Sequence, residues 1–203
     1  LYRTEMEVLV AGRLLSEAEQ CARYSEVRRA MAGRPVCIRL LDLGSDKTAD
    51  WVASTLQGSA AAAQRGAGLL LAHPDRLRAQ ARALARASMH GPIQVLYPMI
   101  SHAEQFVELR ALFDQAVADL QPLGLQHGVL FEVPAACLAA RELMRAADFA
   151  CIGTNDLIQY LFAADRSEGD TAGHARFETD AVLWDLIRIL SRTAARAGKP
   201  MSI

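Results

Sequence analysis

The stretch CIGTNDLIQYLFAADR, residues 151–166, decides the fold prediction because a strand-like apolar run passes directly into a helix-like segment. A buried strand followed by a plain amphipathic helix needs few polar groups. This stretch nevertheless carries six of them: Thr154, Asn155, Asp156, Gln159, Asp165 and Arg166. We therefore expect the junction between the strand and the helix to bind a ligand.

The same alternation of short apolar runs and amphipathic helices extends outward through the chain. Further strand-like runs are expected at residues 36–44, 93–100 and 127–136, and helices at residues 16–35, 73–91, 101–120, 137–147 and 179–200. This alternation predicts an α/β fold with a parallel sheet, closed as a doubly wound open sheet or as a (β/α) barrel. A glycine-rich phosphate loop of the GxGxxG or GxxxxGKS type is absent, which weakens the nucleotide-binding open sheet. No repeat or linker divides residues 1–203, so a single domain is expected.

Helix boundaries can be predicted from capping residues. Ser16 with Glu19, and Ser101 with Glu104, have the spacing of capping boxes. The last helix is expected to begin after Thr179 or Asp180.

The composition excludes several classes of protein. A formal net charge of −1 argues against broad binding to nucleic acid or to anionic membranes. No apolar run reaches the roughly 18 residues that a membrane-spanning helix needs, so a soluble cytoplasmic protein is expected. The cysteines show no CxxC spacing and are interpreted as small apolar residues in a reducing compartment. The five histidines, His127 among them, are expected at the surface because they show no metal-ligand spacing.

Polar side chains follow each strand-like run at its carboxyl end. They are Arg3 and Glu5 in the first segment, Arg39, Asp42, Asp46 and Lys47 in the second, Glu132 after the run at 127–136, and Asn155 with Asp156 in the opening stretch. In both α/β architectures ligands bind at the carboxyl ends of the strands. We therefore expect these side chains to share one site.

The residue types predict the chemistry of that site. Guanidinium groups bind phosphate or carboxylate, and four of them are candidates: Arg3, Arg39, Arg65 and Arg166. Glu132 and Asp156 are oxygen ligands of the kind that Mg²⁺ accepts. Together they suit a small phosphorylated acid. The alternatives are structural: Glu132 and Arg39 as ion-pair partners, Asp156 as a helix N-cap, and Arg65 and Lys47 as residues without a site role.

Five motifs resemble a known family. LYRTE, IRLLDLGSDK, LYPMIS, FEVPAA and IGTNDLIQYLFAADR occur in this order and look like the phosphoenolpyruvate-binding domain of Enzyme I of the sugar phosphotransferase system, phosphoenolpyruvate-protein phosphotransferase. The chain is also similar to the matching domain of pyruvate phosphate dikinase. The resemblance implies a (β/α)8 barrel, Mg²⁺ dependence and transfer of the phosphoryl group of phosphoenolpyruvate to a histidine on another domain. It also implies a homodimer and a small phosphocarrier protein as partner.

The resemblance assigns roles to single residues. It implies that Arg3 and Arg39 hold the phosphate, that Glu132 and Asp156 bind Mg²⁺, and that Asn155 and Arg166 contact the substrate. Lys47 matches the lysine of the family's GGDK motif, which reads GSDK here. Of two arginines in the next family motif only Arg65 is present, with Gly68 at the second position, so this loop is expected to be remodelled.

Two expectations concern the ends of the chain and the range of functions. The family's general-acid cysteine would come just after Ile203, and the first and last barrel strands would lie outside the chain, so the fragment is expected to be an incomplete barrel that is inactive alone. Exposed strand edges would then favour self-association.

A degenerate phosphoenolpyruvate-sensing or scaffold domain is the alternative function, and a lyase of the citrate-lyase β-subunit type is a third.

Overall fold

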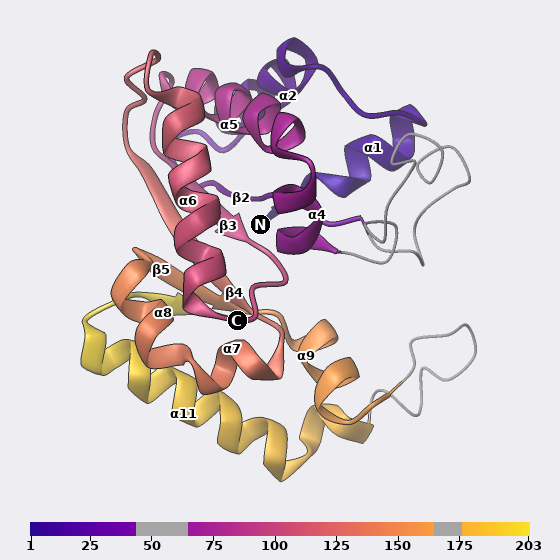
Figure 1. The fold of residues 1–203 in the computed structure, drawn as a ribbon, viewed down its shortest axis with the longest axis vertical. Helices are drawn as coiled ribbons and strands as arrows, with labels where there is room; N and C mark the ends of the chain where they lie inside the picture. The colour runs from indigo at the N-terminus through magenta and orange to yellow at the C-terminus, as the bar shows by residue number, and fades with distance from the viewer. Residues whose placement is uncertain (44–64, 165–175) are drawn as a thin grey trace.

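The computed structural model describes residues 1–43, 65–164 and 176–203. These residues form a six-stranded sheet in which every neighbouring pair is parallel and the spatial order follows the order in the chain (Figure 1). Its strands are β1 (Tyr2–Arg3), β2 (Cys37–Arg39), β3 (Ile93–Tyr97), β4 (Leu125–Phe131), β5 (Phe149–Ile152) and β6 (Met201–Ser202). The predicted parallel α/β fold is therefore confirmed.

The sheet is curled, so its two faces are packed differently. Ile38, Val95 and Val129 point toward the helices and belong to the main hydrophobic core. Leu96, Leu130 and Phe149 point to the other face and form a smaller cluster. This alternation is the two-residue period expected of strands that face a helical layer on one side and a barrel interior on the other. The described sheet is a half-barrel, and the complete eight-stranded barrel remains a prediction.

Helices connect successive strands and cover one face of the sheet (Figure 1). They are α1 (Glu5–Ala11), α2 (Glu17–Ala30), α4 (Gly66–Ala72), α5 (Pro74–Ser88), α6 (Ala103–Val117), α7 (Pro134–Leu138), α8 (Ala140–Ala146), α9 (Thr154–Leu161) and α11 (Ala181–Ala197), with a 3₁₀ turn at Arg176–Thr179. None of the helices in the described part of the chain is long and apolar enough to cross a membrane.

Two predicted helix starts are confirmed in the structure. Ser16 and Glu19 form the predicted capping box at the start of α2. The Asp180 side chain caps α11 by accepting a hydrogen bond from the Val182 amide.

Other boundaries differ from the sequence prediction. The second capping box is wrong: α6 has His102 at its N-cap, and Ser101 bonds to Gln105 instead of Glu104. The run at 127–136 is a strand only as far as Phe131, because Pro134 begins α7, where its missing amide hydrogen costs nothing. The helix predicted at 137–147 is divided at Ala139.

The prediction that His127 lies at the surface is also wrong. His127 is in β4 and only 5% exposed. Its Nδ1 lies 2.8 Å from the Tyr97 hydroxyl, and its ring packs perpendicular to the ring of Phe113. A histidine without metal-ligand spacing can therefore be a core residue when aromatic neighbours supply its polar partner.

Candidate functional site

The predicted site residues lie where the parallel strands end. Arg3 and Arg39 end β1 and β2, Glu132 follows β4, and Asn155 and Asp156 lie in the first turn of α9, directly after β5. All five line one cavity of about 370 Å³. Lys47 and Arg166 fall outside the described residues. The structure therefore brings together the predicted residues from four separate segments at the ligand-binding end of the sheet.

Arg39 is the centre of a buried ion network. One of its nitrogens, Nη2, donates to Glu5 Oε1 and lies 3.6 Å from Asp42 Oδ2. The other, Nη1, lies 3.9 Å from Glu132 Oε2. Arg39 is thus an ion-pair partner, as the structural alternative required, and it also faces the cavity that a ligand would enter.

Arg3 joins this network from β1. Its Nε donates to the same Glu5 oxygen over 3.1 Å, while about half of its side chain remains exposed. Arg3 lies directly opposite Arg39 in the register of β1 and β2. Glu5 therefore bridges two guanidinium groups that the sheet places side by side.

Arg65 lies between two further carboxylates. It donates through Nη2 to Asp42 Oδ2 over 2.8 Å and through Nη1 to Asp156 Oδ1 over 3.0 Å. Burial acts to lower the pKa of Arg65, but the two carboxylates outweigh it and raise that pKa above its ordinary value. Arg65, one of the two arginines of a family motif, therefore pairs with two carboxylates at the strand ends.

Glu132 is almost fully buried, and its Oε1 accepts a hydrogen bond of 2.7 Å from the Met99 amide. Burial and the nearby carboxylates of Asp156 and Asp42 raise the pKa of Glu132 to about 8, against the effect of the Met99 amide and Arg39. A carboxyl in this environment is stabilised as an anion by any added cation.

The backbone around Glu132 has an unusual conformation at Met99 and two close contacts at glycines. Met99 has a φ of 54°, a left-handed conformation that a non-glycine residue seldom adopts, at the residue whose amide bonds Glu132. A Cβ at Gly66 would lie 2.8 Å from Met99 Cβ, and one at Gly153 would lie 2.9 Å from Glu132 Oε2. Only glycine fits at these two positions without displacing the carboxylate or its support.

The site contains four carboxyl groups and three guanidinium groups. Four buried carboxylates, those of Glu5, Asp42, Glu132 and Asp156, face the guanidinium groups of Arg39 and Arg65, with Arg3 at the edge. Glu5 Oε2 and Asp42 Oδ1 are buried and have no hydrogen-bond partner among the residues that the structure describes. No group of three or more His, Cys, Asp or Glu side chains within residues 1–43, 65–164 and 176–203 is arranged to hold a metal. The donor set therefore fits an ion such as Mg²⁺ only if substrate and water complete its coordination.

The sequence did not predict several contacts of this site, and one predicted alternative, the N-cap role of Asp156, is wrong. The position of Glu5 and Asp42 at strand ends predicts that they share the site, but it does not predict their ion pairs with the arginines. The Met99 amide leaves no signal in the sequence. Asp156 is not the N-cap of α9, because Gly153 occupies that position.

The chain matches a known protein family over its whole length. Residues 1–203 match the model of the family described as "PEP-utilising enzyme, PEP-binding domain". The chain is 40% identical over 184 residues to a multiphosphoryl transfer protein of Xanthomonas campestris pv. campestris, a match that covers 90% of the chain and 22% of that protein. Proteins named phosphoenolpyruvate-protein phosphotransferase from Bacillus sp. (strain S) and Priestia megaterium are 37% and 34% identical over 82% and 98% of the chain. These matches cover 30% and 36% of the two relatives.

A solved structure is similar in fold alone. It is a citrate lyase from Burkholderia xenovorans LB400, with a TM-score of 0.53 and 18% sequence identity over 90% of this chain and 50% of that one. The likeness fits a TIM-like arrangement of the half-barrel.

Proposed function

Because the chain belongs to the family of PEP-binding domains of PEP-utilising enzymes, we propose that it binds phosphoenolpyruvate for a phosphotransferase reaction. In that reaction the bond between phosphorus and the enol oxygen breaks, and a histidine nitrogen on another domain takes the phosphoryl group. The enolate that is left takes up a proton at its methylene carbon, which gives pyruvate. The observation that carries the proposal is the convergence of Arg3, Arg39, Glu132 and Asp156 on one cavity. Guanidinium groups would bind the phosphate, with Asn155 at the same rim to contact the substrate.

The proposal includes a magnesium ion. Glu132 and Asp156 would hold it, because both carboxylates are buried and line the same cavity, and the charge of Asp156 helps to raise the pKa of Glu132. Bound there, Mg²⁺ would neutralise negative charge on the substrate oxygens as phosphoryl transfer proceeds. Arg166 and Lys47 are proposed as further substrate contacts.

The proposal extends to partners that the relatives' names suggest. The chain would work with a histidine-bearing phosphocarrier domain and a small phosphocarrier protein, as a homodimer in the cytoplasm. It involves neither nucleic acid nor insertion into a membrane.

A titration of the protein with phosphoenolpyruvate in the presence and absence of Mg²⁺ tests the proposal. We expect binding that requires Mg²⁺, and Arg3→Gln should weaken it by about tenfold through loss of one charge-assisted contact. Arg13→Gln is the matched control, because Arg13 is a similarly exposed arginine paired with one glutamate, Glu19, far from the cavity. A folded protein that shows no heat of binding at millimolar phosphoenolpyruvate would rule out the proposal.

One observation favours a second candidate, a degenerate sensing or scaffold domain. Arg65 already bridges Asp42 and Asp156, so a carboxylate proposed for the metal has a cation beside it. If this bridge persists in solution, phosphoenolpyruvate would bind weakly and without dependence on Mg²⁺. The same titration therefore separates the two candidates.

A further inference from the structure

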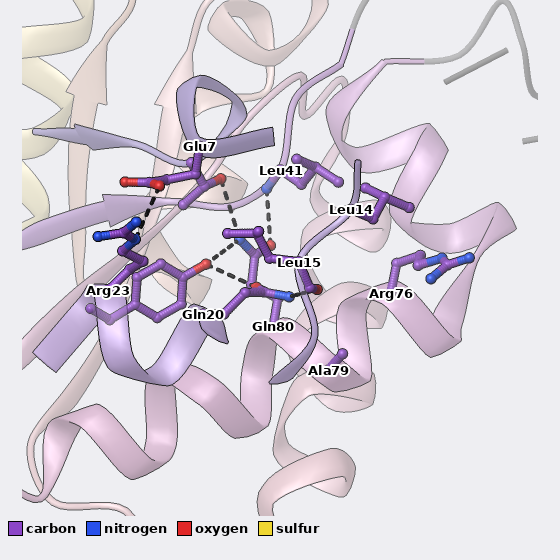
Figure 2. A pocket seen from close by; sticks show the side chains of 11 residues that line it. Glu7, Leu14, Leu15, Gln20, Arg23, Leu41, Arg76, Ala79 and Gln80 are labelled. Atoms are coloured by element: carbon purple, nitrogen blue, oxygen red, sulfur yellow. Dashed lines mark hydrogen bonds and ion pairs between the residues drawn. The ribbon is translucent and has the colours of Figure 1, made fainter. Parts of the chain in front are cut away.

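The side chain of Gln80 connects the ligand site with the helical layer behind the sheet. The side chain projects from α5 (Figure 2), and Gln80 is buried, with only 3% of its surface exposed. We propose that Gln80 is a positioning residue that fixes the carboxyl ends of β1 and β2, and with them the charged side chains of the site. This inference rests on the proposed function.

Gln80 uses both halves of its amide. Its Oε1 accepts a hydrogen bond of 3.0 Å from the Leu41 amide, as Figure 2 shows. Its Nε2 donates to Thr4 Oγ1 over 3.3 Å and to the Tyr24 hydroxyl over 3.1 Å. Thr4 Oγ1 in turn donates to the Arg39 carbonyl over 2.9 Å. One side chain therefore links segments that are 39 and 76 residues away in the sequence.

The anchored groups lie directly beside the site residues. Leu41 precedes Asp42 and lies two residues after Arg39, while Thr4 separates Arg3 from Glu5. The ladder between β2 and β3 continues only to the Leu40 amide, which bonds the Leu96 carbonyl. At Leu41 the backbone leaves the sheet, and the amide is satisfied by Gln80 instead. The backbone next to Asp42 is thus held by a side chain outside the site.

A second set of contacts holds Gln80 itself. The Tyr24 hydroxyl donates to Gln20 Oε1 over 2.9 Å, and Gln20 Nε2 donates to the Leu15 carbonyl over the same distance. The adjoining cavity in Figure 2 has a volume of about 40 Å³, which is enough for only a few water molecules. The network is therefore a support for the strand ends and leaves no room for a substrate of its own. Supporting hydrogen bonds of this kind keep the side chains of a site in the geometry that binding requires.

The test compares Gln80→Met with Tyr24→Phe. Methionine fills the same space but can neither accept from Leu41 nor donate to Thr4, whereas Tyr24→Phe removes one buried hydrogen bond of Gln80 and leaves both anchors. We expect both variants to lose stability in urea unfolding, since each breaks a buried hydrogen bond. Only Gln80→Met should weaken phosphoenolpyruvate binding in the presence of Mg²⁺, by about tenfold or more.

A second readout keeps the test independent of the proposed function. Amide hydrogen exchange at Leu41 should be at least about tenfold faster in Gln80→Met and unchanged in Tyr24→Phe, because only the former removes its acceptor. Thr4→Val should reproduce the loss of binding from the other anchor, even if Gln80→Met does not fold. Equal exchange at Leu41 in Gln80→Met and the parent, or equal losses of binding in Thr4→Val and Tyr24→Phe, would overturn the inference. A parent protein that binds no phosphoenolpyruvate, yet shows the exchange difference, would refute the proposed function and leave the support role of Gln80 standing.

Discussion

At the scale of single residues, Gly153 offers a direct test of the candidate site. A Cβ there would meet Glu132 Oε2 at 2.9 Å and Glu132 Cβ at 3.0 Å. Gly153→Ala should therefore push the carboxylate away from the cavity and weaken Mg²⁺-dependent binding of phosphoenolpyruvate by about tenfold or more. The backbone of Gly153 has a φ of −92°, so alanine itself is not strained there. Isothermal titration measures the change.

Gly198→Ala is the control for this variant. Gly198 has a φ of +65° at the end of α11, so alanine costs about 1 kcal/mol of stability there. Apart from the residues next to it in the chain, no described residue has an atom within 4 Å of the added Cβ, so binding should not change. If Gly198→Ala weakened binding as much as Gly153→Ala does, general destabilisation would explain both results and Gly153 would have no special role.

The sequence predicts the residues of the site as well as it predicts the ends of the strands. Arg3, Arg39, Glu132, Asn155 and Asp156 share a cavity because the carboxyl ends of parallel strands meet at one edge of a sheet. The importance of Glu5 was not predictable, since it depends on Arg3 and Arg39 being opposite each other in the register of β1 and β2. The register depends on how two strands pair, so the sequence of either strand alone does not specify it.

At the scale of elements, the start of α6 gives a test with a matched pair of residues. Gln105 Oε1 accepts from the Ser101 amide over 2.9 Å and from its hydroxyl over 3.2 Å, whereas Glu104 is exposed. Gln105→Ala should lower the free energy of unfolding by about 1 kcal/mol, and Glu104→Ala by less than about 0.5 kcal/mol. Urea unfolding of the two variants measures the difference. A larger loss in Glu104→Ala would restore the capping box that the sequence pattern predicted.

The elements themselves follow from local patterns more closely than their ends do. Ser16 and Glu19 cap α2 as predicted, because both partners lie within one turn and need nothing from the rest of the fold. Ser101 and Glu104 have the same spacing, yet the chain turns at Met99 and His102 occupies the N-cap, so Gln105 is the residue that reaches back. The left-handed conformation of Met99 depends on tertiary contacts, and no local pattern encodes it.

At the scale of the whole molecule, the alternation of strands and helices was sufficient to predict a parallel sheet covered by helices. It did not distinguish an open sheet from a barrel, because both bury the same alternating pattern. The structure shows a curled, six-stranded half-barrel with Leu96, Leu130 and Phe149 on the face opposite the main core, and closure into a complete barrel remains a prediction. His127 was misplaced for a related reason: its burial depends on Tyr97 and Phe113 from two other elements.

This burial of His127 makes global stability depend on pH. Burial lowers the pKa of His127 to about 4, and Arg110 adds to the effect, while Asp114 and Asp148 oppose it. Between pH 4 and the ordinary value of 6.5 the unfolded chain binds a proton at His127 that the folded protein does not. The neutral ring therefore stabilises the fold fully above pH 6.5, and this contribution of about 2–3 kcal/mol is lost as the pH falls toward 4.

The prediction concerns the difference between the parent protein and His127→Gln. Glu132, whose pKa is raised to about 8, acts in the opposite direction, because its neutral form favours the fold at low pH and its ionisation opposes it as the pH rises. Subtracting the free energy of unfolding of His127→Gln removes this shared term, since glutamine keeps a polar group for Tyr97 but does not titrate. The difference should grow with pH from 4 to 6.5 and be constant above, as measured by urea unfolding at half-unit steps. Parallel profiles for the two proteins would mean that His127 titrates alike in the folded and unfolded states, so that its burial carries no proton linkage.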